Sequence, residues 1–395
     1  MKIKSLFYHN QDLNWQLERT EFANLNLLVG ASGVGKTRIL EAILDVQRIA
    51  NGASLSGVAW DIEFMIDGEV YRWEGAFENT RLSRNQTVRQ AQGTASFPTI
   101  GGVDHNSKAP ILHETLSYSQ AKIVRRTGSE IVFQGQKVPV KLSVFESVVS
   151  LFHEDDGVKA IYHALTRGIF KTQFYSLTGG LFLIPEITEG IDLELLRQYN
   201  DNAFHKLAIA YYKAPEIFER IKQDFRDVFP NVEDVRVKLT PIEKVQRGYL
   251  TLEIPAGVRW LEIHFYIKEV GVEQLIHHNY VSSGMLKTLG FIANMHLCAD
   301  GSVILIDEFE NSLGVNCIDI LNDLLLEERN LQYVITSHHP YIINNVPMDA
   351  WKIVTRAGSV VRVRNAEAFR LGDSKHQAFM QLMQLEEFTE GINVE

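Results

Sequence analysis

The 395-residue chain has only two cysteines, Cys298 and Cys317, which are too few and too far apart for a disulfide framework or a zinc site. Both lie in apolar patterns, so we expect buried thiols in a reducing environment. No apolar run reaches the roughly 18 residues that a membrane span needs. The first residues also lack the apolar stretch of a signal peptide. We therefore expect a cytoplasmic location and no membrane partner.

Positive charge is scarce as well, because 39 Lys and Arg residues face 49 Asp and Glu residues, for a net charge of −10. A protein that coats DNA nonspecifically would usually be basic. DNA contact therefore stays possible locally but is not supported by the net charge. We interpret two basic stretches, Arg81 to Arg89 and Lys122 to Arg126, as solvated surface. The sequence has no internal repeat and no heptad run long enough for an extended coiled coil.

One motif is clear, at residues 30–37, which fit G-x-x-x-x-G-K-[ST]. Residues 25–29 predict a buried strand entering this loop, and residues 38–49 predict a helix leaving it. The glycines let backbone N–H groups turn inward around phosphate oxygens, and the helix N-terminus adds partial positive charge. We expect Lys36 to reach the β- and γ-phosphates and the Thr37 hydroxyl to bind Mg²⁺. The predicted nucleotide-binding residues of this loop are Gly30, Ala31, Ser32, Gly33, Val34, Gly35, Lys36 and Thr37.

The rest of the chain alternates between strand and helix patterns. Residues 60–77 predict a hairpin that turns at Asp67 and Gly68, and the polar residues 79–110 predict a long loop. Residues 145–230 predict mostly helices, one over Asp192 to Tyr212 and another with Pro215 at its first position. Strand patterns return at 233–239, 248–254 and 259–268.

Residues 303–308 form an apolar strand pattern that ends in two acids, Asp307 and Glu308. Buried strands often end in acids, so the pattern is weak by itself. Beside a phosphate-binding loop it predicts a Walker B strand. Asp307 is then expected to hold Mg²⁺ through the coordination shell of the ion, and Glu308 is expected to polarise the attacking water.

Two polar turns flank this strand along the chain. Ser282, Ser283 and Gly284 open an apolar helix that Ser282 is expected to cap, with N–H groups that suit an anion. By itself this segment is better explained as an ordinary helix cap. Downstream, an apolar strand over 333–335 runs into a Thr-Ser-His-His turn, where a histidine can hydrogen-bond phosphate or water. A pair of histidines is usually structural, and without a third ligand it does not make a metal site.

The order and spacing of these segments resemble the ABC-type ATPase head, in the branch that contains SMC, RecF and OLD proteins. The resemblance implies an α/β fold of the P-loop NTPase type, an ABC-ATPase head with a helical insertion. The implied domains are an N-terminal ATPase lobe (1–145), the helical insertion (146–230) and a C-terminal lobe (231–395) with signature, Walker B and His switch. It also implies ATP and Mg²⁺ as cofactors and ATP hydrolysis as the activity.

In this family the signature of one subunit binds the γ-phosphate that the P-loop of another subunit holds. The resemblance thus implies a homodimer or larger homo-oligomer in which Ser282, Ser283 and Gly284 act in trans. It implies that residues 311–313 are the D-loop and that His338, which directly follows Thr-Ser, is the switch histidine. The chain departs from the family pattern in its P-loop, which has Ala-Ser where Pro-Asn is common, and in a D-loop without aspartate. The Q-loop glutamine has no clear position.

The resemblance also narrows the kind of ATPase. Transporter subunits are shorter, SMC proteins have coiled-coil arms, and OLD nucleases carry a TOPRIM domain that the roughly 50 residues after His339 are too few to form. The tail resembles stand-alone ATPases of bacterial anti-phage systems such as PARIS and Septu. We expect an ATPase subunit that controls a separate effector, a nuclease or toxin, through residues 190–229 and 79–110. The alternative is a RecF-like DNA repair ATPase that acts directly on DNA.

Overall fold

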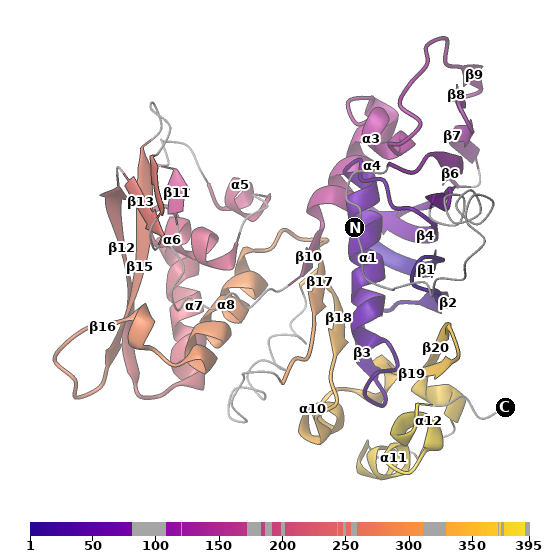
Figure 1. Ribbon diagram of the computed structural model, residues 1–395. Coiled ribbons are helices and arrows are strands. Elements are labelled where there is room, and N and C mark those ends of the chain that lie inside the picture. Colours follow the sequence, from indigo (N-terminus) through magenta and orange to yellow (C-terminus); the bar gives the residue numbers. More distant parts are fainter. Residues whose placement is uncertain are drawn as a thin grey trace, which may run out of the picture. The chain divides into compact units, whose positions relative to one another are not determined.

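The chain forms two compact units in a computed structural model (Figure 1). Unit 1 comprises residues 1–171, 301–307 and 330–395, and unit 2 comprises residues 172–300 and 308–329. The predicted domain boundaries near residues 145 and 230 stay a prediction. The structure describes residues 1–80, 108–119, 121–171, 183–185, 192–198, 202–242, 244–247, 250–253, 259–310, 329–369, 371–372 and 375–391.

Unit 1 is built on a large mixed sheet with the strand order β10-β17-β18-β3-β19-β20-β2-β1-β4-β5-β6-β7-β8-β9 in the described residues. Strands β10, β17, β18, β3 and β19 run parallel, whereas in the run β2-β1-β4-β5-β6-β7-β8-β9 each strand pairs antiparallel with the next. The carboxyl ends of the five parallel strands therefore share one edge, which is where ligand sites form in such sheets. The strands are β1 (Lys2–Asn10), β2 (Trp15–Glu21), β3 (Leu25–Val29), β4 (Val58–Ile66), β5 (Glu69–Phe77), β6 (Ile111–Tyr118), β7 (Ala121–Thr127), β8 (Glu130–Phe133), β9 (Gln136–Lys137), β10 (Ile169–Lys171), β17 (Val303–Ile306), β18 (Gln332–Thr336), β19 (Trp351–Ala357) and β20 (Val360–Asn365).

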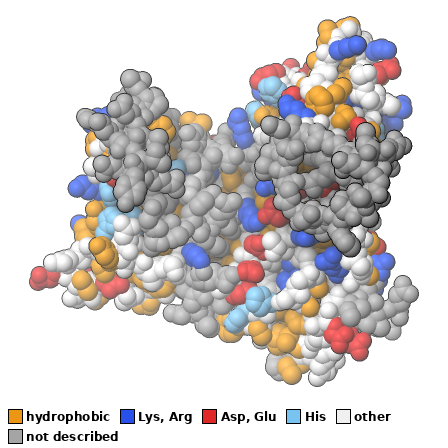
Figure 2. All heavy atoms as spheres, viewed as in Figure 1, with side chains coloured by type: hydrophobic (Ala, Val, Ile, Leu, Met, Phe, Trp, Pro, Cys, Tyr) orange, Lys and Arg blue, Asp and Glu red, His pale blue; other side chains and the backbone are white. Residues whose placement is uncertain are grey.

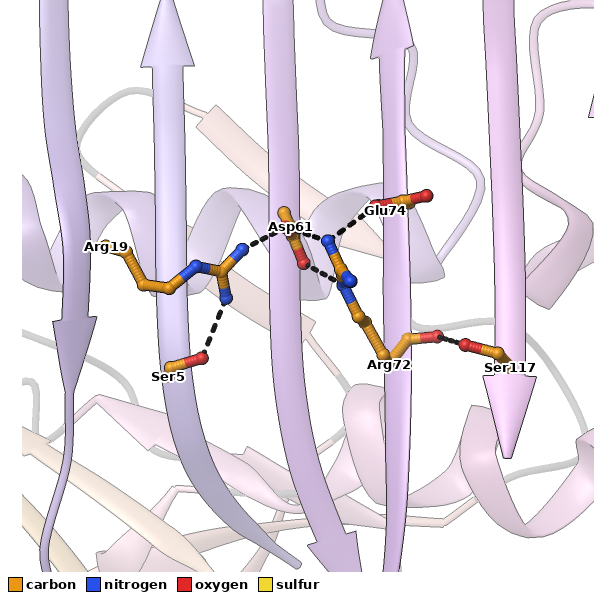
Figure 3. A network of polar contacts seen from close by, with 6 residues as sticks. All are labelled: Ser5, Arg19, Asp61, Arg72, Glu74 and Ser117. Carbon is orange, nitrogen blue, oxygen red and sulfur yellow. Dashed lines mark hydrogen bonds and ion pairs between the residues drawn. The ribbon is translucent and has the colours of Figure 1, made fainter. Parts of the chain in front are cut away.

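The antiparallel part of this sheet has one apolar and one polar face, because its side chains alternate. On β4, Ile62 and Phe64 are buried, whereas Asp61 points to the opposite face. Figure 3 shows Asp61 between the guanidinium groups of Arg19 and Arg72, and Arg72 donates two hydrogen bonds to it, at 2.9 and 2.7 Å. Half-exposed ion pairs of this kind add little stability each, so the network marks a polar outer face. Its other members are Ser5, Glu74 and Ser117.

Helix α1 (Lys36–Ala50) lies against the apolar face of the sheet and supplies much of the core of unit 1. Ser147 joins two helix ends: its side chain caps α3 (Val148–Leu151) and donates to the Ile49 carbonyl of α1 at 2.9 Å. Asp155 caps α4 (Asp156–Arg167) in the same way. The described residues of unit 1 also form the helices α10 (Pro340–Asn345), α11 (Lys375–Leu382) and α12 (Glu386–Thr389), with short 3₁₀ turns η2 (Met348–Ala350) and η3 (Ala366–Phe369).

Unit 2 packs helices against a small antiparallel sheet with the order β11-β15-β12, to which β16 adds beside β15. Phe204 on α6 packs against Phe265 on β15, with ring centroids 5.4 Å apart. A Cβ atom at Gly290 of α8 would lie 3.1 Å from the Phe204 ring, so the glycine allows α6 and α8 to pack closely. The elements in the described residues of unit 2 are β11 (Leu183–Pro185), α5 (Leu193–Gln198), α6 (Ala203–Lys213), α7 (Pro215–Val228), β12 (Val232–Ile242), β13 (Lys244–Arg247), β14 (Leu250–Glu253), β15 (Trp260–Glu269), β16 (Ile276–His277), η1 (His278–Tyr280) and α8 (Ser283–Leu297).

The C-terminus of α8 is held by cationic side chains from three other segments. Lys206 donates to the Leu297 carbonyl at 3.1 Å, Arg197 to the His296 carbonyl at 3.2 Å, and Arg329 to the Cys298 carbonyl at 2.9 Å. The last carbonyls of a helix have no partner within it and carry partial negative charge. These cations therefore fix the end of α8 within unit 2.

Most of the predicted elements are confirmed: the strand at 25–29, the helix after the loop, the hairpin at Asp67 and Gly68, Pro215 at a helix start and the three later strands. The single helix predicted over 192–212 is wrong, because α6 starts anew where the Asn202 side chain accepts a hydrogen bond from the Phe204 N–H. Of the predicted loop at 79–110, residues 81–107 lie outside the described residues.

Two expectations about individual side chains are also decided. Cys298 is buried as predicted, and burial raises the pKa of its thiol to about 11. Cys317 lies outside the described residues. The interpretation of Arg126 as solvated surface is wrong: it is 1% exposed, because its guanidinium binds the backbone carbonyls of Ser143 and Glu146. No helix in the described ranges is long and apolar enough to cross a bilayer.

Candidate nucleotide-binding site

The predicted phosphate-binding loop connects the end of β3 to the start of α1, at the carboxyl edge of the parallel strands. Gly30 has φ +148°, and a Cβ atom there would lie 2.5 Å from the carbonyl oxygen of Val354 on the neighbouring strand β19. Gly35 is the N-cap of α1, with φ 108°. Side chains rarely adopt these conformations, so both glycines are required by the path of the loop.

Lys36 and Thr37 begin α1 and carry the polar atoms expected to meet phosphate and metal. The Lys36 ammonium donates to the carbonyl oxygens of Gly30 (2.7 Å) and Ala31 (2.9 Å), so it lies over the loop that precedes it. The Thr37 hydroxyl donates to Oδ1 of Asp307 at 3.0 Å. The structure thus brings together two predicted site residues that are 270 positions apart in the sequence.

Asp307 directly follows β17 and lies among side chains from both neighbouring strands. Its Oδ1 also accepts a hydrogen bond from the hydroxyl of Thr336, at the end of β18, at 2.8 Å. Its Oδ2 lies 3.9 Å from the ammonium of Lys171, at the end of β10. Lys171 in turn donates to Glu41, one turn after Thr37 on α1, at 2.6 Å. Three strand ends and one helix therefore converge on a single carboxylate.

The donor set around Asp307 fits Mg²⁺. A hydroxyl and a carboxylate are hard oxygen ligands, and Mg²⁺ is usually bound through one or two such groups together with water and substrate phosphates. Thr37 and Asp307 are held 3.0 Å apart by elements of one unit, so both can serve the same ion. These two residues would hold the metal, which supplies charge neutralisation for the transferred phosphate.

Glu308, the predicted catalytic carboxylate, is exposed and has φ +48°. A residue other than glycine costs roughly 1–2 kcal/mol in this left-handed region. Conformations of this kind concentrate at functional sites, where the surrounding structure maintains them. The role of Glu308 as the catalytic carboxylate stays a prediction.

The Thr-Ser-His-His turn follows β18 as predicted, and its first two side chains are buried. The Ser337 hydroxyl accepts a hydrogen bond from the His339 N–H at 3.1 Å, and the Ser337 N–H donates to the Leu28 carbonyl of β3 at 3.3 Å. This holds the turn beside the strand that leads into the phosphate loop. His338 is exposed, whereas His339 is half-buried. The choice of His338 as switch residue stays a prediction.

The signature-like turn lies in unit 2. The prediction that Ser282 caps the following helix is confirmed, because its side chain accepts a hydrogen bond from the Met285 N–H at 3.2 Å. Ser283 is exposed in the first turn of α8, and the Gly284 carbonyl accepts from the Thr288 hydroxyl at 2.9 Å. The capped helix leaves N–H groups of its first turn open to an anion. The predicted D-loop at 311–313 lies outside the described residues.

Sequence reasoning missed Lys171 and Glu41, and it named Thr336 only as part of the polar turn, without its hydrogen bond to Asp307. Lys171 and Thr336 reach Asp307 because β10 and β18 flank β17 in the sheet. Glu41 was detectable in part, since it lies four residues after Thr37 and so on the same helix face. No local signal identified Lys171, which belongs to a three-residue edge strand.

Comparisons with known proteins agree with part of this picture. Residues 181–344 match the family described as "AAA domain, putative AbiEii toxin, Type IV TA system". The match includes the signature-like turn, Asp307 and His338 but not the phosphate loop. Among solved structures, the SMC head domain from Thermotoga maritima is similar, with a TM-score of 0.42, 11% sequence identity and coverage of 92% of this chain and 99% of that chain. No curated protein matches the chain in sequence.

The predicted α/β P-loop fold is confirmed by the phosphate loop between β3 and α1 and by a large sheet whose parallel part places Asp307 beside it. The chain is therefore an α/β protein with a P-loop, and less than half of its length, residues 181–344, is similar to an AAA domain.

Proposed function

We propose that this chain binds and hydrolyses ATP with Mg²⁺. The observation that carries the proposal is the hydrogen bond from Thr37 to Asp307, which joins the start of α1 to the end of β17. A hydroxyl after a phosphate loop and a carboxylate at a strand end are the two protein groups that hold Mg²⁺ in P-loop NTPases. Lys36 is the phosphate contact, Glu308 polarises the attacking water, and His338 hydrogen-bonds the γ-phosphate or that water.

The first test is nucleotide affinity, measured with a fluorescent ATP analogue and Mg²⁺. Lys36→Ala removes a charged contact, so we expect affinity to fall by about 10- to 100-fold, the scale of one hydrogen bond to a charged group. Lys137→Ala is the matched control, because Lys137 is an exposed lysine paired with Glu130 on another strand. Unchanged affinity and turnover in Lys36→Ala would exclude this site.

The second test separates binding from hydrolysis. Glu308→Gln keeps the shape of the side chain and removes its charge, so bound ATP should persist while turnover falls about a hundredfold or more. The amount of ATP that remains after rapid filtration gives the first quantity, and phosphate release gives the second. Lost binding with normal turnover per bound ATP would assign the catalytic role elsewhere.

We further propose that two copies share their ATP sites, with Ser282, Ser283 and Gly284 of one copy completing the site of the other. The open helix start of α8 supports this, since Ser283 is exposed beside a capped turn. Mixing Lys36→Ala with Ser283→Arg subunits gives heterodimers with at most one intact composite site. Activity should therefore be partly restored relative to either variant alone. Full, concentration-independent activity of an isolated monomer would rule the sharing out.

Finally, we propose that this ATPase is a subunit of a bacterial anti-phage complex and controls a separate nuclease or toxin. The matched family description, which names a putative toxin of a type IV toxin–antitoxin system, supports this direction. Charge supports it over direct action on DNA: the net charge is −10, and on the face seen in Figure 2 basic and acidic side chains are interspersed. ATP can control an effector only if the effector binds one nucleotide state of the ATPase more tightly than another.

A pull-down with the product of the neighbouring gene, with and without ATP, tests this last step. We expect capture that depends on the nucleotide and is altered by Lys36→Ala. Residues 190–229 and 79–110 are the proposed docking segments, because the nucleotide site needs neither. Metal-dependent DNA cleavage by the purified chain alone, lost on changing its own carboxylates, would replace this proposal with a nuclease function.

A further inference from the structure

Lys171 lies beside the proposed metal site without being part of any motif. It ends β10, which pairs in parallel with β17 so that Lys171 is opposite Leu305, two residues before Asp307. Its side chain is 19% exposed, and its ammonium lies 2.6 Å from Oε1 of Glu41 and 3.9 Å from Oδ2 of Asp307. One cation is therefore shared between two carboxylates.

The two oxygens of Asp307 have different surroundings. Oδ1 accepts hydrogen bonds from the hydroxyls of Thr37 and Thr336, at 3.0 and 2.8 Å. Oδ2 is the oxygen nearer to the ammonium of Lys171. A divalent cation held by Thr37 and Asp307 would share the charge of this carboxylate with the lysine. Repulsion between the two cations would follow from their common partner.

We propose that Lys171 is a positioning residue of the metal site: its ammonium, tethered by Glu41, competes with Mg²⁺ for the Asp307 carboxylate and lowers the metal affinity of the nucleotide site. The inference rests on the proposed function. The tether decides how strongly the lysine competes, because the Glu41 contact is shorter than the Asp307 contact by more than 1 Å. Glu41 therefore draws the ammonium away from Asp307. Removing the charge of Lys171 should raise the metal affinity, whereas removing the charge of Glu41 should lower it.

The test measures metal affinity directly, with Mn²⁺ as the probe, by the electron paramagnetic resonance signal of free Mn²⁺ at saturating ADP. Lys171→Met keeps a similar length and removes the charge, so Mn²⁺ should bind about three- to tenfold more tightly, a range reduced for partial solvent exposure. Glu41→Gln releases Lys171 toward Asp307 and removes a nearby anion, so Mn²⁺ should bind more weakly. Lys137→Met, an exposed lysine on β9, is the control and should leave Mn²⁺ affinity unchanged.

A second measurement separates this role from a phosphate contact. ATP affinity in EDTA should be the same in the wild type and in Lys171→Met, because a competitor for the metal has no effect when metal is absent. Weaker ATP binding in EDTA, or Mn²⁺ affinity that falls or stays constant in Lys171→Met, would overturn the inference. If Lys171→Met does not fold, Glu41→Gln still tests the sign, and Lys171→Arg should retain affinity close to that of the wild type.

Failure of the inference and failure of the proposed function give different results. If the wild type binds neither ADP nor ATP, the nucleotide site itself is wrong. If the wild type binds nucleotide and Mn²⁺ but Lys171→Met leaves the Mn²⁺ affinity unchanged, the nucleotide site stands and only the role of Lys171 is refuted.

Discussion

Gly30→Ala is the substitution for which the structure gives the sharpest expectation. An alanine there would adopt φ +148°, which costs of order 1–3 kcal/mol for a residue with a side chain. Its Cβ would also lie 2.5 Å from the Val354 carbonyl oxygen. That oxygen belongs to β19, which pairs with β3 on one side and β20 on the other, so it cannot move without disturbing both pairings.

We therefore expect Gly30→Ala to destabilise unit 1 by about 3 kcal/mol or more, in the range reached by strain at a special backbone position combined with overpacking. At ~2–4 °C per kcal/mol for a unit of this size, the melting temperature should fall by about 6–12 °C. Nucleotide affinity should fall with it, because the loop backbone must shift away from β19.

Gly33→Ala is the matched control within the same loop. Gly33 also has positive φ, +83°, but a Cβ atom there meets no heavy atom within 4 Å. Only backbone strain remains, so the free energy of unfolding should fall by about 1–2 kcal/mol. The melting temperature should then fall by about 2–8 °C. Differential scanning calorimetry measures the melting temperatures of both variants, and Gly30→Ala should melt at the lower temperature. Equal melting temperatures would show that the approach to β19 does not restrict Gly30.

Three further expectations concern ionisable groups. Burial raises the pKa of Glu114 to about 7 although Trp73 donates to it at 2.8 Å, so the protonated form favours folding. The free energy of unfolding of unit 1 should then fall by up to ~3 kcal/mol as pH rises from about 4.5 to 7. In denaturant titrations, Glu114→Gln should reduce this pH dependence. Burial lowers the pKa of His278 in unit 2 to about 4, so stability there is lost as pH falls from 6.5 toward 4. Amide hydrogen exchange, corrected for intrinsic rates, should show that rising pH lowers the protection of unit 1 and raises that of unit 2. Lys206→Met should cost about 3 kcal/mol, because two carbonyls lose a buried charged donor, whereas the exposed Lys213→Met should cost under 0.5 kcal/mol.

The features predicted from sequence are those whose cause is local. The strand before the phosphate loop and the helix after it require backbone angles that favour glycine. A pattern of eight residues was therefore enough to identify the loop. The cap by Ser282 and the helix start at Pro215 are local for the same reason, since each satisfies or removes a donor within one turn.

The features that sequence did not reveal depend on the order of strands in the sheet. Lys171 and Glu41 are 130 residues apart, and they meet because β10 is placed beside β17, over the helix that follows the loop. Arg126 is a similar case: its sequence neighbours are basic and polar, yet it is buried because carbonyls from a later segment, Ser143 and Glu146, surround its guanidinium. Charge patterns alone do not show such partners.

Lys36, Thr37 and Asp307, which are expected to meet phosphate and Mg²⁺, already have partners inside unit 1. Lys36 donates to carbonyls of its own loop, Thr37 donates to Asp307, and Lys171 is shared between Glu41 and Asp307. Binding is therefore an exchange of partners, and an exchanged hydrogen bond contributes far less than its gross strength. Phosphate binding alone would displace the contacts of Lys36, and metal binding alone would displace those of Asp307. When both bind, their opposite charges would also neutralise each other. Nucleotide and metal should consequently bind cooperatively, and by linkage the factor by which ADP tightens Mn²⁺ binding must equal the factor by which Mn²⁺ tightens ADP binding.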